Sequence, residues 1–270
     1  MPGASLRYNT RGRRRFRHEL ICVRIIAALA PIVLLVAAGA CGGDDDEGQA
    51  TASGVAIEPE AQQRAESINL TLADFPDGWR IAAPESDDDT GREVFNECIS
   101  VDSSGLTRTG DAESKDFFTQ GGQAEQASSA VVIFDDEQQA EDAMSKSSEG
   151  FGSSAADDCF QDVNERAARA EGDNEGFFEV VKFGEVDIGE LSFTPPDVDE
   201  AQAWQIVIPL ESTSGAGEGL EPNFYLDLVL LREGDTTARL LTQKVVTEFD
   251  RDLRDELIQT LAHRMTQAAA

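Results

Sequence analysis

The strongest constraint on this chain is an abrupt change of character at Cys41. A basic stretch at residues 7–24 leads into sixteen mostly apolar residues, 25–40, and an acidic run follows directly after the cysteine. Sixteen residues are too few for a comfortable transmembrane span, and a basic stretch before an apolar one is typical of a bacterial export signal. We therefore expect residues 1–40 to be a signal peptide that takes no part in the folded domain.

The apolar segment ends on small residues placed directly before Cys41, an arrangement that resembles a lipobox. In lipoproteins of this kind the cysteine thiol receives a diacylglyceryl group and the chain is cut just before it. Cys41 is thus predicted to anchor the protein to the extracytoplasmic face of the cell membrane. Ala38 stands where leucine is commoner, which leaves open a plain signal anchor with Cys41 unmodified. The RRRF stretch at 13–16 leaves open twin-arginine export.

The rest of the chain is strongly acidic. The formal net charge is −30, and the first forty residues, with seven arginines and one acid, oppose that trend. Such a surface repels nucleic acid and anionic lipid headgroups, so no nucleic-acid partner is expected. It fits either plain solubility or a saline habitat. Residues 41–60 are predicted to be a flexible acidic tether, and residues 61–270 a single extracytoplasmic domain.

Two cysteines remain for the exported domain, Cys98 and Cys159. Cys22 lies within the signal, and Cys41 is assigned to the lipid. Exported proteins fold in an oxidising compartment, where an even pair of cysteines forms a disulfide by default. We predict a bond between Cys98 and Cys159. Neither residue has a CxxC partner and the exported chain has one histidine, His263, so neither a metal site nor a cofactor is expected.

Hydrophobic patterning in the first half predicts few regular elements. Residues 68–84 open the domain with a turn and an extended segment, and residues 110–122 read as a loop-rich approach to a strand. A strand is predicted over 127–134, followed by a helix over 136–147 with Asp135 as its N-cap and Gln138 as the capping-box partner. A second helix is predicted over 154–169.

The second half is richer in β-branched and aromatic residues, which favours strands over 176–193 and 203–212. Two apolar runs flank Glu233-Gly234-Asp235 and predict a hairpin. Apolar side chains at four-residue steps then predict a closing amphipathic helix: Phe249, Leu253, Leu257, Leu261 and Met265. The predicted fold is α+β, an antiparallel sheet with helices packed on one face and one disulfide.

Three of these units together resemble a known group of proteins. They are LTLADFPDGW at 70–79, VVIFDDEQQAEDAM at 131–144, and the apolar hairpin before the final helix. The chain is similar in them to actinobacterial envelope lipoproteins and to the extracellular sensor domain of PknH-type serine/threonine kinases, over about residues 68–267. The resemblance implies a cleft bordered by sheet and helices, without catalytic residues. The family's sensor domain usually has two disulfides, whereas this chain has cysteines for one.

These observations lead us to expect a non-enzymatic ligand-binding or sensor-like domain, with a small envelope molecule or a partner protein as its ligand and no assigned ligand-binding residues. The alternative is a carrier of lipid or another hydrophobic molecule, which requires a large apolar cavity. An enzyme using unrecognised acid chemistry is a third class, although no GxSxG, HExxH, Walker or dinucleotide motif occurs. His263 is interpreted as a solvated helix residue, and Trp79 and Trp204 as core residues rather than pocket linings.

Overall fold

The computed structural model describes residues 57–81, 105–119, 125–153, 156–162, 181–212 and 222–269. Its helical elements are α2 (Pro59–Ile68), the short 3-10 helix η2 (Leu72–Asp74), α4 (Glu137–Phe151), a short helix at 156–162 and α6 (Arg251–Ala269). Its strands are β1 (Trp79–Ile81), β2 (Arg108–Glu113), β3 (Phe117–Thr119), β4 (Glu125–Phe134), β5 (Val181–Phe183), β6 (Asp187–Glu190), β7 (Glu200–Ser212), β8 (Asn223–Glu233) and β9 (Thr236–Val245).

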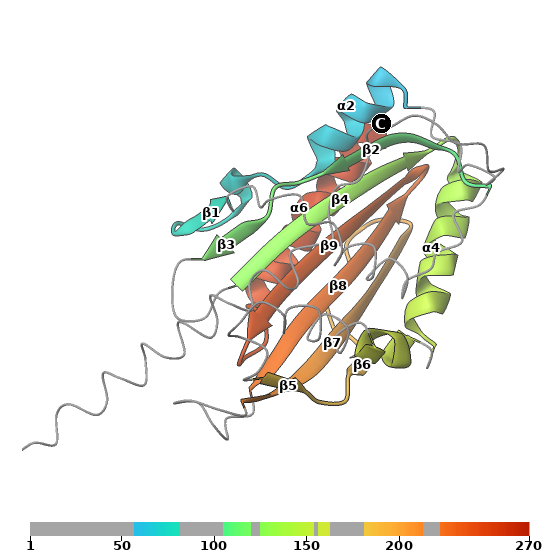
Figure 1. Cartoon of the computed structure of the whole chain (residues 1–270). Helices are drawn as coiled ribbons and strands as arrows, with labels where there is room; N and C mark the ends of the chain where they lie inside the picture. The colour runs from blue at the N-terminus through green and yellow to red at the C-terminus, as the bar shows by residue number, and fades with distance from the viewer. Residues whose placement is uncertain are drawn as a thin grey trace, which may run out of the picture.

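The nine strands of this described part form one antiparallel sheet in the order β1-β3-β4-β9-β8-β7-β5, with β2 beside β4 and β6 beside β7 (Figure 1). Four long strands, β4, β9, β8 and β7, make its centre. The outer edge of β4 is shared by β2 and β3, and the outer edge of β7 is shared by β5 and β6. The mixed helix and antiparallel-sheet architecture predicted from the sequence is confirmed.

The β8–β9 hairpin is confirmed where the sequence predicted it. Gly234 adopts a φ of 55°, in the left-handed region that a tight hairpin turn needs and that glycine enters without steric cost. The register continues from the Glu233–Thr236 pair to the Phe224–Val245 pair without a slip. Because neighbouring side chains on a strand point to opposite faces, this register decides which residues of the hairpin face which helices.

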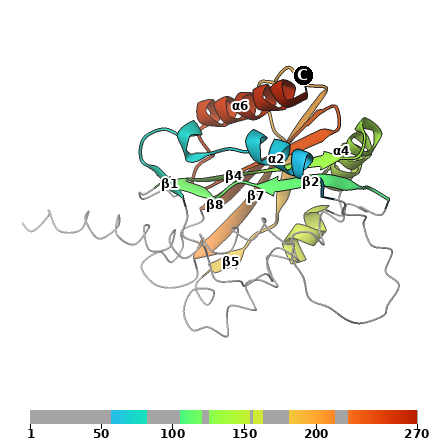
Figure 2. The same cartoon turned by 90° about the horizontal axis from the view of Figure 1, so that it is seen from above.

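One face of the sheet, here called the α6 face, is covered by α2 and α6 (Figure 2). The predicted spacing in α6 is confirmed, since its buried apolar residues lie in the main core with side chains from the sheet. The core residues on this face include Val131, Ile133, Val229, Leu231, Leu240, Leu257, Ile258, Leu261 and Met265.

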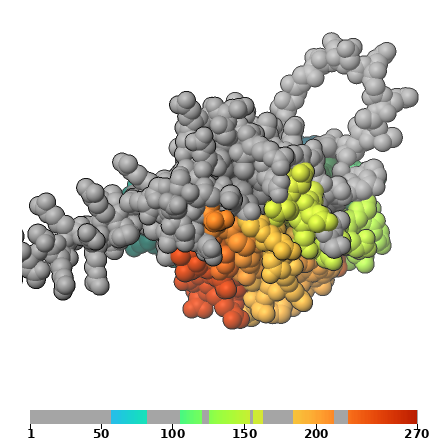
Figure 3. Space-filling view, turned by 60° about the horizontal axis from the view of Figure 1, so that its bottom comes forward, coloured from blue at the N-terminus to red at the C-terminus, as the bar shows by residue number. Residues whose placement is uncertain are grey.

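The other face, here called the α4 face, carries α4 and the helix at 156–162, so the expectation that helices pack on one face only is wrong. Val132 of β4 packs with Ala140 and Ala143 of α4, whereas its neighbour Val131 lies in the core under α6. The described residues 181–212 and 222–269 include segments that lie side by side next to these helices (Figure 3). The apolar run in β8 is buried on both sides, and such uninterrupted runs are typical of strands covered on both faces.

Four elements differ from the prediction in the first half. Residues 110–122, expected to be loop-rich, contain most of β2 and all of β3, and α2 begins within the segment expected as the tether. The N-cap of α4 is Asp136, whose carboxylate accepts a hydrogen bond from Gln139 N at 2.9 Å, one residue after the expected cap. Few of the α2 residues are apolar, and only Ala65 and Ile68 are buried, which explains why periodicity did not reveal this helix.

No helix in the described part of the chain is long and apolar enough to cross a bilayer. Cys41 and Cys98 lie outside the described residues. Cys159 lies in the helix at 156–162 and is disulfide-bonded. The identity of its partner as Cys98 stays a prediction, as does the lipid on Cys41.

Candidate functional site

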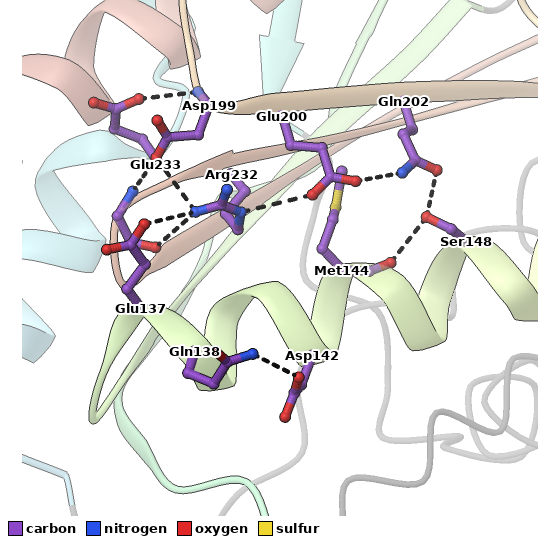
Figure 4. Close-up of polar contacts among 11 residues, drawn as sticks. Glu137, Gln138, Asp142, Met144, Ser148, Asp199, Glu200, Gln202, Arg232 and Glu233 are labelled. Carbon is purple, nitrogen blue, oxygen red and sulfur yellow. Dashed lines mark hydrogen bonds and ion pairs between the residues drawn. The ribbon is translucent and has the colours of Figure 1, made fainter.

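A polar cluster between α4 and the ends of β7 and β8 surrounds Arg232 (Figure 4). Arg232 lies on the α4 face of β8, paired across the sheet with Glu200 of β7. Its side chain is 11% exposed, and its guanidinium lies 3.3 Å from Asp199 Oδ2, 3.6 Å from Glu200 Oε2 and 3.6 Å from Glu137 Oε1. We call these four residues the Arg232 cluster. It brings together residues from α4, β7, β8 and the segment before β7.

The polar contacts continue along α4. The Gln202 side chain donates to Glu200 Oε1 and contacts the Ser148 hydroxyl of α4, which also donates to the Met144 carbonyl at 2.9 Å. Figure 4 shows these side chains between α4 and β7. Together with the Arg232 cluster, they place polar contacts near both ends of α4.

Beyond Gln202, the α4 face becomes apolar. Trp204 stacks on Phe151 with ring centroids 5.2 Å apart, and Phe151 lies 6.1 Å from Phe160 of the helix at 156–162. On the α6 face, Trp79 contacts Phe75 and Phe249. Both tryptophans therefore pack among apolar residues, as the sequence predicted.

The Arg232 cluster carries more negative than positive charge. Three carboxylates face one guanidinium, and the side chains of Glu137 and Asp199 remain 69% and 44% exposed. The exposed carboxylates of Glu137 and Asp199 attract cationic groups and hydrogen-bond donors from solvent. Within the described ranges, no three His, Cys, Asp or Glu side chains are arranged to hold a metal ion. His263, interpreted from the sequence as a solvated helix residue, is exposed on α6, with Nε2 lying 2.9 Å from Gln267 Nε2.

Arg232 is expected to stabilise the fold by separating these carboxylates. Replacing it with glutamine should lower the free energy of unfolding by about 1–3 kcal/mol, because buried charge-assisted contacts are lost and the acids then face one another. Urea unfolding followed by tryptophan fluorescence measures this. Arg80→Gln, at an exposed position of β1, is the control and should change the free energy by less than about 0.5 kcal/mol. Equal effects would contradict the role given to Arg232.

A second polar centre lies between α6 and the sheet. Arg254 of α6 and Asp227 of β8 form an ion pair at 2.6 Å, with side chains only 3% and 1% exposed. Gln205 Nε2 also donates to Asp227 Oδ1 at 2.9 Å, and Arg254 Nη2 donates to the Ser192 carbonyl at 3.3 Å. The pair is enclosed in the core, so its role is to fix where α6 docks on the sheet.

A third polar centre joins the two ends of the domain. Arg264 of α6 donates to the Asn69 carbonyl at 2.7 Å and to both carboxylate oxygens of Asp74, at 2.7 and 3.0 Å. Thr71 N also donates to Asp74 Oδ2 at 2.7 Å. Burial by itself raises the pKa of the Asp74 carboxyl, but the hydrogen bonds from Arg264 and Thr71 and the charge of Arg264 outweigh it, so the pKa lies below its ordinary value.

This lowered pKa predicts a pH-dependent contribution to stability. The contribution of ionised Asp74 is complete above the unfolded-state pKa, about 3.9, and is lost as the pH falls through the lower folded-state pKa. Asp74→Asn should therefore destabilise the domain by a constant amount above about pH 5 and by progressively less below about pH 4. Urea unfolding at a series of pH values measures the difference. The neighbouring exposed Asp77→Asn is the control, and a difference that does not depend on pH would exclude this role of Asp74.

No protein-family model and no curated protein matches the chain. Among solved structures, the chain is similar to the crystal structure of the extracellular domain of PknH from Mycobacterium tuberculosis. The TM-score is 0.40 and the sequence identity 9%, over 78% of this chain and 98% of that domain. At this identity the similarity concerns the fold alone.

Proposed function

We propose that this protein is a lipid-anchored protein of the extracytoplasmic face, and that its domain binds a small envelope molecule or a partner protein in a sensor-like manner without catalysis. The observation that carries the proposal is the order of segments in the sequence: a basic and then apolar stretch typical of an export signal, Cys41, an acidic segment, and then an α+β domain described from Ile57. A flexible link of about 15 residues spans roughly 20 Å, which would keep the domain close to the membrane.

The Arg232 cluster is the region that best supports recognition. Its partly exposed carboxylates lie on a framework of helix and strands that restrains their positions, and this suits a ligand or partner surface that offers a positive charge. Glu137 and Asp199 are the residues expected to contact it. The resemblance of the sequence to a sensor domain without catalytic residues supports the same class of function.

The anchor is tested by mass spectrometry of the protein from membrane fractions. We expect wild-type protein to begin at a Cys41 that carries a diacylglyceryl group, because small residues precede this cysteine directly. Cys41→Ala should abolish lipidation and leave uncleaved precursor or released protein. Cys22→Ala, within the signal, is the matched control and should still be lipidated. Wild-type protein with an unmodified Cys41 and its signal attached would overturn the proposal.

The disulfide is tested separately. We propose that Cys159 pairs with Cys98, because these are the two thiols left in the domain once Cys41 carries lipid. Thiol titration of the mature protein, unfolded without reductant, should find no free thiol. Titratable thiols in that sample would contradict the pairing.

The alternative function, a carrier of hydrophobic molecules, predicts a different result from the same preparation. A carrier purified from the envelope should retain a lipid-like molecule in a constant molar ratio, in addition to the lipid on its own cysteine. Mass spectrometry of an organic extract measures this. A constant ratio would favour the carrier, and its absence would favour a binding or sensing domain.

A further inference from the structure

The outer edge of β2 is covered by the beginning of α2. On its inner side β2 pairs with β4. On its outer side, the Thr109 carbonyl accepts a hydrogen bond from Glu58 N at 2.7 Å, and Asp111 N donates to Gln62 Oε1 at 3.1 Å. These two groups of β2 flank Gly110, and they are the acceptor and donor with which a neighbouring strand would pair. The first turn of α2 therefore takes the place of a further strand.

Gly110 allows this close approach. A Cβ atom at this position would lie 2.6 Å from both the carbonyl carbon and the carbonyl oxygen of Ala61, and 3.0 Å from Gln62 N. Only a residue without a side chain fits there while the backbone of α2 lies directly against the strand edge.

The two ends of α2 are held differently. Residues 57–60 are exposed and Ala61 and Gln62 are half-buried, whereas Ala65 and Ile68 are fully buried. The N-cap residue, Glu58, makes no side-chain capping hydrogen bond. An uncapped first turn with little buried apolar surface opens more easily than a turn anchored in the core.

We propose that residues 58–62 of α2 form a latch over the β2 edge, which opens and closes while the second half of the helix stays packed. Opening releases the Thr109 carbonyl and the Asp111 amide. If the chain is anchored through Cys41 as proposed above, this turn is the point where the expected tether meets the domain, so displacement of the tether acts on the latch first. Only this trigger rests on the proposed function, because the opening itself is a property of the fold.

The test is amide hydrogen exchange on the full chain carrying Cys41→Ser. Gln62→Ala removes the acceptor of the Asp111 amide, and we expect that amide to exchange about tenfold faster while amides of the β8–β9 pairing are unchanged. Glu58→Asp supplies a better N-cap and should slow the exchange of the same amide. Gln63→Ala is the matched control, since Gln63 is the same residue type, adjacent and exposed.

Two results would overturn the latch. In the first, Gln62→Ala leaves the exchange of the Asp111 amide unchanged, so the edge is not covered in the manner proposed. In the second, exchange rises equally in β2 and in the β8–β9 pairing, so the turn does not open independently of the core. Because the protein measured carries no lipid, neither result depends on whether the natural chain is lipidated at Cys41.

Discussion

Replacing Arg254 with methionine is expected to destabilise the domain by about 3–5 kcal/mol, the cost of leaving one charge of a buried pair without its partner. Asp227 would keep a hydrogen bond from Gln205, but its carboxylate lies in the core and cannot recover its hydration. The measurement is urea unfolding at neutral pH, with circular dichroism to show that the variant is folded in the absence of urea.

The double variant Arg254→Met and Asp227→Leu separates a buried charge from a simple loss of packing. Removing both charges should restore most of the stability, because two apolar residues are tolerated where one unpaired charge is not. Arg108→Met serves as the control, since the Arg108–Asp111 pair is more than one-third exposed on both sides and should contribute about 0–1 kcal/mol. A double variant no more stable than Arg254→Met would show that the ion pair is not the cause.

Gly110→Ala should destabilise the domain by about 1–3 kcal/mol, the usual cost of forcing an added methyl group into a filled space. The nearest atoms are backbone atoms of Ala61, so the added methyl group would push the first turn of α2 away from the edge of β2. Chemical unfolding again measures the effect, and exchange of the β2 amides should increase together with the loss of stability.

Gly150→Ala is the matched control for this substitution. Gly150 lies within α4, and a Cβ atom there meets no atom within 4 Å. Alanine favours helix over glycine, so this variant should gain about 0.5–1 kcal/mol. A similar loss of stability in both variants would mean that the contact with Ala61 is not what makes Gly110 necessary.

The elements that the sequence predicted correctly are those with strong local signals. The β8–β9 hairpin has a glycine turn between two apolar runs, and α6 has apolar residues at helical spacing along its whole length. The strand β4 and helix α4 were predicted with boundaries shifted by a few residues. In each of these cases the information lies within about twenty neighbouring residues.

The elements that were missed depend on partners far away in the chain. β2 is a short and partly polar strand, completed by its pairing with β4 and by the approach of α2 to Gly110. The ion pairs are harder still to predict, because Glu137 and Arg232 are far apart in a chain with 52 acidic residues. Asp227 did carry a readable signal, since an acid inside an apolar strand needs a partner, but nothing local indicates that the partner is Arg254.

The hydrogen bonds between Arg264 and Asp74 join residues that are 190 positions apart, and the central β4–β9 pairing joins Glu125 to Lys244. A chain is synthesised from its N-terminus, so β4 is made long before the strand that covers its inner edge. Closing such long loops is slow, and contacts of this separation lengthen the search for the native state. The sheet therefore cannot be completed until nearly the whole chain is available. Until then, the apolar side chains of β4 must be protected from contact with other chains.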